Sequence, residues 1–517
     1  MIAKAVMVLG TTSGAGKSWL TTALCRYYAR QGLKVAPFKA QNMSNNARVV
    51  EGGEIGSAQY FQALAAKATP DVRMNPLLLK PEKDTQSQVV LMGQVNAELS
   101  KLDWRGRSTL VWPVLARALD ELMAENDVVV IEGAGSPAEI NLKPSDIVNM
   151  RVALHAKAAC LLVTDIDRGG AFAHLYGTWA MLDAEEQKLI KGFALNKFRG
   201  DAKLLAPGPQ MLQDLTGVPT VATLPMWWQH GLPEEDGIDM APTLVASRTA
   251  LPPEGAAAPV ARQSRFHGPD LKGTENSAFM HRPFTTIAVI AYPRISNLDE
   301  FQPLKNVPGV RLVWARSPAD VLNADWIILP GSKATSSDLA WLRVQGLDAA
   351  IASHAGRGGA VLGICGGLQM LGEALIDPHG IDGNAAGLGL LPVVTVFDLD
   401  KTVRHRQATF TELNGLWSAL SNVAVQGYEI HHGQTAPHAA MAAAGDVAKP
   451  VMSDALAWQN PGGNVLGLYL HGMFEDPQVL QALFGASVPT LDSVFEGLAD
   501  FIEQHFEPGV LQSLIAA

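Results

Sequence analysis

Cys365 stands in a setting that suits a covalent nucleophile. An apolar run over residues 360–364 is typical of a short buried strand, and Gly366 follows the cysteine. The spacing Gly363-x-Cys365-x-Gly367 is that of a nucleophile elbow, a tight turn from a strand into a helix that pushes the nucleophile out of the sheet. The helix N-terminus favours the thiolate, and backbone N–H groups there can hold an oxyanion. The pattern favours acyl-transfer chemistry over a buried structural thiol.

A cysteine nucleophile needs a base, and His471 is the candidate. It follows an apolar run that is typical of another buried strand. Because parallel strands end at one edge of a sheet, Cys365 and His471 are expected to meet. Gly331 and Ser332, at the end of a further strand, are expected to complete an oxyanion pocket with Gly366.

A phosphate-binding loop is expected near the N-terminus. An apolar strand is followed by Gly10-Thr-Thr-Ser-Gly-Ala-Gly-Lys-Ser18 and then by a helical pattern. In such a loop the backbone N–H groups cradle phosphates, Lys17 reaches the β- and γ-phosphates, and Ser18 binds Mg²⁺. The first glycine comes one position earlier than in GxxxxGK[ST], which would place it at Thr11. The predicted ATP-binding residues are Thr12, Gly14, Gly16, Lys17 and Ser18.

Three other strand ends carry polar groups that an α/β sheet would direct at a ligand. Glu132 ends an apolar strand and precedes glycines, which suits a Mg²⁺ ligand beside Ser18. Asn196 ends a later strand and is a candidate contact for a nucleotide base. An amide-rich loop after the strand 34–38 is the candidate substrate loop. Its candidate binding residues are Lys39, Gln41, Asn42 and Asn45.

The composition is that of a globular protein with more than one core. The chain has 517 residues, of which 48% are hydrophobic and 17% charged. A net charge of −10 without a long basic run disfavours nucleic acid as a partner. Three cysteines without CxxC spacing fit a reducing, cytoplasmic compartment. No apolar run reaches the roughly 18 residues of a membrane span, so no membrane partner is expected.

Strand and helix patterns alternate through most of the chain. This alternation predicts an α/β fold with doubly wound, mostly parallel sheets, and it places the polar loops at the carboxyl ends of strands. The helix of the elbow is expected over residues 368–375. The periodicity fades over residues 233–283, where Pro and Gly are frequent, so this stretch is expected to link two domains.

The elbow, together with Leu329-Pro-Gly-Ser332 and Tyr469-Leu-His471-Gly, resembles class-I glutamine amidotransferases. The displaced glycine of the phosphate loop resembles the dethiobiotin-synthetase-like branch of P-loop proteins. Among proteins that join these two domains, Pro37-Phe-Lys-Ala-Gln-Asn-Met-Ser-Asn45 and Tyr428-Glu-Ile-His431 resemble the cobyric acid synthase family. The resemblance covers nearly the whole chain and is weakest over residues 233–283.

The resemblance implies two α/β domains, each with a doubly wound, mostly parallel sheet. The first, over residues 1–232, would be a P-loop NTPase-like domain that acts as an ATP-dependent amide ligase. A linker over residues 233–283 would follow. The second domain, over residues 284–480, would be a class-I glutamine amidotransferase-like domain, followed by a C-terminal helical segment over residues 481–517.

The resemblance also implies a reaction. It is the amidation of the b, d, e and g carboxylates of adenosylcobyrinic acid a,c-diamide to give adenosylcobyric acid, in cobalamin biosynthesis. Glutamine would be cleaved through a thioester on Cys365, and ATP would phosphorylate the carboxylate that ammonia attacks. The implied partners are glutamine, ATP with Mg²⁺ and a corrinoid substrate, without a tightly bound cofactor. Gln369 is the implied further residue of the glutamine pocket.

The resemblance leaves some points open. Class-I members usually carry His-x-Glu, but position 473 is Met473, so the third member of the site stays open between Glu475 and Glu429. Alternative functions are a cobyrinic acid a,c-diamide synthase, another glutamine-dependent carboxylate amidase or, from a different class, a P-loop switch ATPase. The switch ATPases have a second lysine where Thr12 stands. The oligomeric state also stays open, and a homo-oligomer is compatible with the sequence.

Overall fold

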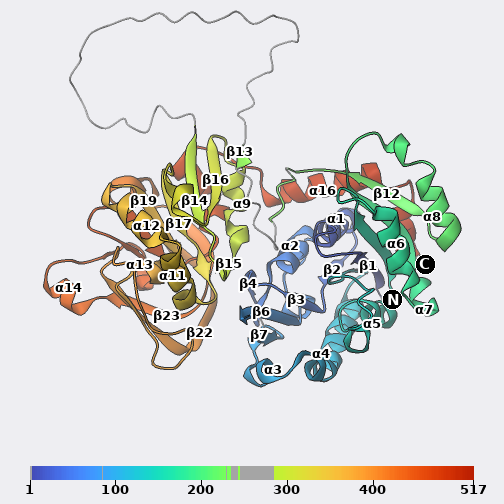
Figure 1. The fold of residues 1–517 in the computed structure, drawn as a ribbon, viewed down its shortest axis with the longest axis horizontal. Coiled ribbons are helices and arrows are strands. Elements are labelled where there is room, and N and C mark those ends of the chain that lie inside the picture. The colour runs from blue at the N-terminus through green and yellow to red at the C-terminus, as the bar shows by residue number, and fades with distance from the viewer. Residues whose placement is uncertain (1–2, 84–85, 229, 234–242, 245–283, 517) are drawn as a thin grey trace, which may run out of the picture.

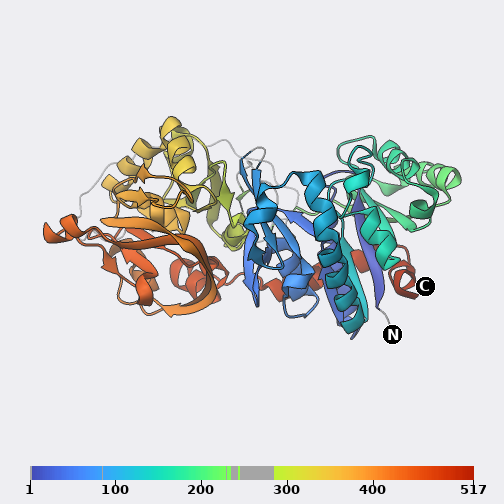
Figure 2. The same cartoon turned by 90° about the horizontal axis from the view of Figure 1, so that it is seen from below.

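The computed structural model describes residues 3–83, 86–228, 230–233, 243–244 and 284–516. Two α/β units lie side by side along the long axis of the molecule, and both chain ends lie at the outer end of the first unit (Figures 1 and 2). This arrangement confirms the predicted fold class. The predicted linker, residues 233–283, lies outside the described residues except for positions 233, 243 and 244.

The first unit is built on a six-stranded sheet in which every neighbouring pair of strands is parallel. Its strands, in spatial order, are β12 (Thr220–Pro225), β11 (Ile190–Phe198), β10 (Ala159–Asp165), β1 (Lys4–Gly10), β9 (Val128–Glu132) and β2 (Val35–Phe38). The central strands are apolar along their length because both faces of the sheet are covered. Val6 and Val8 of β1 face one hydrophobic core, while Met7 and Leu9 face the other.

Helices from distant parts of the chain cover the two faces of this sheet. One face carries α1 (Lys17–Arg30), α2 (Ser57–Ala65), α16 (Leu491–His505) and α17 (Val510–Ala516). The other face carries α4 (Trp104–Glu125), α5 (Met150–Ala156) and α6 (Ala171–Ala180). The C-terminal helices therefore return to the first unit. Arg26 and Arg30 of α1 form ion pairs with acidic residues of α16.

Short strands inserted after β2 extend the first unit toward the second (Figure 1). One small sheet contains β3 (Gln41–Met43), β6 (Leu77–Lys83), β7 (Gln86–Leu91) and β8 (Gln94–Val95). A separate hairpin contains β4 (Ala47–Val50) and β5 (Gly53–Gly56). This hairpin contacts β22 (Val393–Thr409) and β23 (Ala424–Pro437) of the second unit. The inserted strands thus form a large part of the contact between the units.

The second unit contains an eight-stranded sheet that is parallel in its middle. Its strands, in spatial order, are β13 (Thr243–Leu244), β16 (Val310–Ala315), β14 (Thr285–Ile290), β17 (Trp326–Leu329), β19 (Ala360–Ile364), β26 (Val465–Leu468), β25 (Ala457–Gln459) and β24 (Lys449–Pro450). A four-stranded sheet contains β20 (Ala374–Ile376), β21 (Ala385–Ala386), β22 and β23. Further helices are α11 (Thr335–Val344), α12 (Leu347–Gly356), α13 (Gly366–Leu371) and α15 (Pro477–Phe484).

The elbow helix is shorter than the sequence predicts. It ends at Leu371, and β20 begins at Ala374, within the range expected to be helical. The cause is Gly372, whose backbone is extended and where an added Cβ would come 2.8 Å from the carbonyl oxygen of Val393. Within the described ranges, none of the helices combines the length and the apolar character that a membrane crossing needs.

Candidate active sites

Cys365 lies between the end of β19 and the start of α13. Its backbone φ of +51° is unusual for a residue with a side chain, as a sharp strand-to-helix turn requires. The turn packs tightly against β17, because a Cβ on Gly367 would lie 1.9 Å from the carbonyl oxygen of Leu329. The thiol is buried, and its sulfur lies 3.6 Å from the carbonyl oxygen of Ile430.

His471 follows β26, the strand next to β19, and its side chain is buried. Nδ1 lies 3.1 Å from Oε1 of Glu300, while Oε2 of Glu300 accepts the backbone N–H of Gly472 at 3.0 Å. The ring also stacks on Tyr428, with 5.3 Å between centroids. Burial alone would lower the pKa of His471, but the charge of Glu300 and the interaction with Cys365 raise this pKa to about 10. The site therefore holds a Cys–His–carboxylate arrangement.

The carboxylate that pairs with His471 belongs to a residue that was not predicted from the sequence. Glu300 lies in the short helical turn η4 (Leu298–Phe301) and is fully buried. Neither predicted acid takes this place: Glu475 pairs with Arg48, while Glu429 pairs with His431, Arg404 and Arg406. The one sequence signal was an acidic pair, Asp299-Glu300, shortly after the first strand of the second unit.

The backbone around the thiol has the form of an oxyanion pocket. A Cβ on Gly366 would lie 2.8 Å from the backbone nitrogen of Ser332, and one on Gly331 would lie 2.9 Å from Cε1 of His471. The predicted residues Gly331, Ser332 and Gly366 are thus close to one another and to the candidate base. Gln369 is buried behind them and accepts a hydrogen bond from Thr335 at 3.2 Å.

The cysteine cavity is small, about 100 Å³, and both units line it. Cys365, Ser332 and Gln369 lie on its wall. The first unit contributes Asn45, Lys80, Glu82 and Gln88. The last three belong to β6 and β7, so the inserted strands form part of the wall of the cysteine site.

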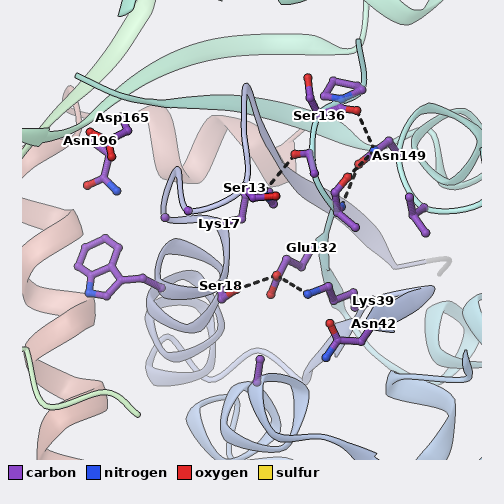
Figure 3. Close-up of a pocket in the computed structure, with 18 of the residues that line it drawn as sticks. Ser13, Lys17, Ser18, Lys39, Asn42, Glu132, Ser136, Asn149, Asp165 and Asn196 are labelled. Carbon is purple, nitrogen blue, oxygen red and sulfur yellow. Dashed lines mark hydrogen bonds and ion pairs between the residues drawn. The ribbon is translucent and has the colours of Figure 1, made fainter. Parts of the chain in front are cut away.

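A second cavity of about 1070 Å³ lies over the phosphate loop (Figure 3). Gly14, Gly16, Lys17 and Ser18 line it. Both glycines have positive φ, +72° and +101°, which lets the loop curl around a phosphate. The ammonium group of Lys17 lies 3.1 Å from the carbonyl oxygen of Thr12. The loop residues predicted to bind ATP therefore surround one cavity or support its wall.

Asn196 also borders the large cavity, but its side chain supports the phosphate loop. Its Nδ2 donates to the carbonyl oxygen of Ala15 at 2.9 Å. A Cβ on Gly16 would lie 2.0 Å from the same nitrogen, so the loop needs glycine there. Contact between Asn196 and a nucleotide base stays a prediction.

Glu132 and Ser18 suit a Mg²⁺ ion. The hydroxyl of Ser18 lies 2.8 Å from Oε1 of Glu132 (Figure 3). Octahedral Mg²⁺ with bonds of about 2.1 Å holds adjacent oxygen ligands roughly 3 Å apart, so these oxygens fit one edge of the octahedron. Burial would raise the pKa of Glu132, but Lys39, 2.8 Å away, and Gln62 lower it and favour the carboxylate form. Other ligands would come from phosphate and water, because the described residues hold no group of three acidic, histidine or cysteine side chains arranged to bind a metal ion.

The predicted substrate loop is divided between the two cavities. Lys39, Gln41 and Asn42 line the large cavity, whereas Asn45 lines the cysteine cavity. The segment 39–45, which contains β3, therefore runs from one candidate site to the other. Gln41 Oε1 and Asn45 Oδ1 are buried and have no hydrogen-bond partner among the described residues.

Comparisons with known proteins match both units. A family model of CobQ/CobB/MinD/ParA nucleotide binding domains matches residues 6–232, and a model of CobB/CobQ-like glutamine amidotransferase domains matches residues 286–479. The chain is 80% identical over 516 residues to a cobyric acid synthase of Polaromonas sp. (strain JS666), covering 100% of this chain and 99% of the relative.

Two further relatives match over the same extent. A cobyric acid synthase of Polaromonas naphthalenivorans is 78% identical over 519 residues, and one of Variovorax paradoxus is 70% identical over 516 residues. Each match covers 100% of both chains. The order of the two units is therefore shared with full-length relatives.

Proposed function

Because the chain belongs to the cobyric acid synthase family, we propose that it amidates the b, d, e and g carboxylates of adenosylcobyrinic acid a,c-diamide with ammonia from glutamine. Membership of the family makes the protein a glutamine-dependent ligase of cobalamin biosynthesis. The product of the proposed reaction is adenosylcobyric acid. One observation carries the proposal: the segment 39–45 lines both the phosphate-loop cavity and the cysteine cavity.

We assign the two half-reactions to two domains. Residues 1–232 form the proposed ligase domain and residues 284–480 the proposed glutaminase domain, divisions that the family-model ranges support. The C-terminal segment 481–517 contributes the helices that pack on the ligase domain. The proposed linker is residues 233–283.

In the glutaminase, the Cys365 thiolate attacks the side-chain amide carbon of glutamine. The N–H groups of Gly366 and the β18 strand (Gly331–Ser332) stabilise the oxyanion. His471, whose raised pKa keeps it protonated at neutral pH, gives its proton to the leaving nitrogen, so ammonia departs and a γ-glutamyl thioester remains. Neutral His471 then takes a proton from water, which hydrolyses the thioester to glutamate and regenerates the thiolate.

In the ligase, a substrate carboxylate oxygen attacks the γ-phosphorus of ATP and ADP leaves. Ammonia attacks the carbonyl carbon of the resulting acyl phosphate, phosphate departs and the nitrogen loses a proton, which leaves the amide. The phosphate loop and Lys17 orient the ATP phosphates. Mg²⁺ bound by Ser18 and Glu132 would supply positive charge to these phosphates. Each of the four carboxylates consumes one ATP and one glutamine.

Ammonia has to reach the acyl phosphate before it is protonated in bulk water. Gln41 Oε1, at the start of β3, and Asn45 Oδ1, two residues beyond its end, have no partner among the described residues, and each can accept a hydrogen bond from ammonia. We therefore place the ammonia route along the segment 39–45. The cysteine cavity is lined by both domains, which supports this placement.

The test is product formation by the wild type and by Cys365→Ala, with glutamine or ammonium as nitrogen source. We expect the wild type to make a tetra-amidated corrin from either source and the variant to make it from ammonium alone. The matched control is Cys160→Ala, because burial raises the pKa of that strand thiol to about 12 and keeps it inert. Use of glutamine by Cys365→Ala would contradict the assignment of Cys365 as the nucleophile. Amidation of the a and c carboxylates of cobyrinic acid instead would favour the a,c-diamide synthase.

A further inference from the structure

Arg48 is a ligase-domain residue whose side chain is buried against the glutaminase domain. It lies in β4, and its side chain is 3% exposed. Nε lies 3.0 Å from Oδ2 of Asp299, and Nη1 lies 3.0 Å from Oε2 of Glu475. Both carboxylates belong to the second domain. Burial alone would lower the pKa of Arg48, but these two carboxylates raise it well above its usual value, so the group stays charged.

The two carboxylates adjoin the catalytic acid and base. Asp299 directly precedes Glu300 in η4, and Glu475 lies in the turn η7 (Met473–Glu475) that follows His471. One guanidinium group therefore joins the turn that holds Glu300 to the turn that follows His471, and Glu300 and His471 themselves meet at 3.1 Å. These turns are not neighbours in sequence, so their spacing has to be fixed by tertiary contacts.

We propose that Arg48 is a positioning residue of the glutaminase, supplied by the ligase domain, and that the Glu300–His471 pair is held in its working geometry only when Arg48 is docked. This inference rests on the proposed function. The inference extends the proposed function, because it makes the glutaminase dependent on a residue of the ligase domain.

Other contacts show that the ligase domain holds this part of the site as a unit. The backbone N–H of Ala47 donates to Oδ1 of Asn297 at 3.0 Å, just before η4. The guanidinium carbon of Arg48 lies 5.0 Å from the centre of the Tyr428 ring, which also stacks on the ring of His471. Arg48 therefore touches a carboxylate beside the acid, a carboxylate beside the base and the ring against which the base packs.

Arginine suits this position better than lysine would. Its planar fork presents several N–H groups in fixed directions and can bind two carboxylates at once. A lysine carries a compact point charge on a flexible stem, and its rotating N–H groups fix the directions of two carboxylates less firmly. We therefore expect glutaminase activity to fall even in Arg48→Lys, which keeps the positive charge.

The experiment uses the full-length protein with Arg48→Gln. Glutamate release from glutamine gives kcat and KM, and amidation is measured separately with ammonium. We expect kcat for glutamate release to fall about 10- to 100-fold, because small displacements of a general base cost rates of that order. KM for glutamine and the ammonium-dependent rate should stay within about twofold of wild type.

The matched control is Arg73→Gln, because Arg73 also joins carboxylates of separate elements, at 2.8 Å to Asp71 and 2.7 Å to Glu125, but within the ligase domain. Arg73→Gln should leave kcat and KM for glutamate release and the ammonium-dependent rate unchanged. If Arg48→Gln does not fold, Arg48→Lys replaces it and should give the same pattern with a smaller fall in kcat.

An unchanged kcat in either Arg48 variant, or an equal fall in glutamine- and ammonium-dependent activity, overturns the inference. Absence of corrin amidation by the wild type contradicts the proposed function instead. Glutamate release by the variants then still decides the role of Arg48.

Discussion

The carboxylate of Glu300 lies 3.1 Å from Nδ1 of His471, although 171 positions separate the two residues in the chain. Its second oxygen is held by the N–H of Gly472 at 3.0 Å, so its orientation is fixed. A histidine held through Nδ1 turns Nε2 toward the reacting atoms. The acid that class-I relatives usually place two residues after the histidine is thus supplied here from a turn before the nucleophile.

Glu300→Gln is expected to lower kcat for glutamate release by about 100-fold or more, because an amide does not stabilise the imidazolium that the mechanism requires. The pKa of His471 should also fall, since burial lowers it and the Glu300 charge opposes that effect. The imidazolium form is then lost at lower pH than in the wild type. The alkaline decline of the glutaminase pH profile should therefore move to lower pH.

Glu429→Gln is the informative comparison for this prediction. Glu429 pairs with His431, Arg404 and Arg406, so the alkaline limb set by His471 should stay where it is. The opposite result would be a shifted alkaline decline in Glu429→Gln and an unshifted one in Glu300→Gln. It would show that Glu429, which the sequence predicted, is the acid that acts on His471.

Gly367→Ala is expected to disrupt the elbow. The added Cβ would lie 1.9 Å from the Leu329 carbonyl oxygen, a backbone atom that cannot move aside cheaply. We expect the free energy of unfolding of the glutaminase domain to fall by about 2–5 kcal/mol, with loss of glutamate release.

Gly356→Ala is the control for the elbow variant. It lies at the end of α12, where an added Cβ meets nothing within 4 Å, so stability should be unchanged or slightly raised. Chemical denaturation of both variants gives the comparison. Equal stability of the two proteins would show that the elbow is not packed as described.

Local spacing predicted the parts of each site that lie close together in sequence. The phosphate loop around Lys17 and the elbow around Cys365 each combine a strand, a glycine-rich turn and a helix within about 20 residues. His471 could be paired with Cys365 because strand ends share an edge of a parallel sheet. The glycines of the phosphate loop and of the elbow could also be predicted, because a tight turn tolerates few other residues.

Residues that enter a site by tertiary packing could not be predicted in this way. Glu300 belongs to a turn without a periodic pattern, and Arg48 belongs to an inserted hairpin of the other domain. The substrate loop was predicted as one site, but its residues Lys39 and Asn45 line two different cavities. The residues at a domain contact depend on how two separate surfaces pack together. Local sequence spacing does not predict this packing.

Glu132→Gln is expected to separate the two half-reactions. The amide loses the charge that suits Mg²⁺ and that pairs with Lys39 at 2.8 Å. ATP-dependent amidation with ammonium should fall about 100-fold or more, and the Mg²⁺ concentration needed for half-maximal rate should rise. Glutamate release without ATP should be unaffected, because Cys365 and His471 lie in the other cavity. A parallel fall of both activities would contradict the assignment of Glu132 to the metal.

Glu54→Gln is expected to weaken the domain contact in a pH-dependent way. Glu54 is buried, and its two oxygens bind Lys80 of the ligase domain and Lys401 of the glutaminase domain, each at 2.6 Å. Burial alone would raise the pKa of Glu54, but Lys401 and Lys80 lower it to about 2. Because the folded-state pKa is depressed, the stabilisation is present above the unfolded pKa of roughly 4.3 and is lost as the pH falls toward 2.

The variant should therefore be less stable than the wild type by about 3 kcal/mol at pH 7, because the buried Lys80 and the partly buried Lys401 lose their shared carboxylate. The difference should persist at pH 5 and shrink near pH 3, as the wild-type carboxylate begins to lose its advantage. Urea unfolding at the three pH values measures it. Glu98→Gln, which breaks an exposed pair with Lys101, should show no change at any of them. A difference that does not depend on pH would show that Glu54 acts through shape and packing instead of through its charge.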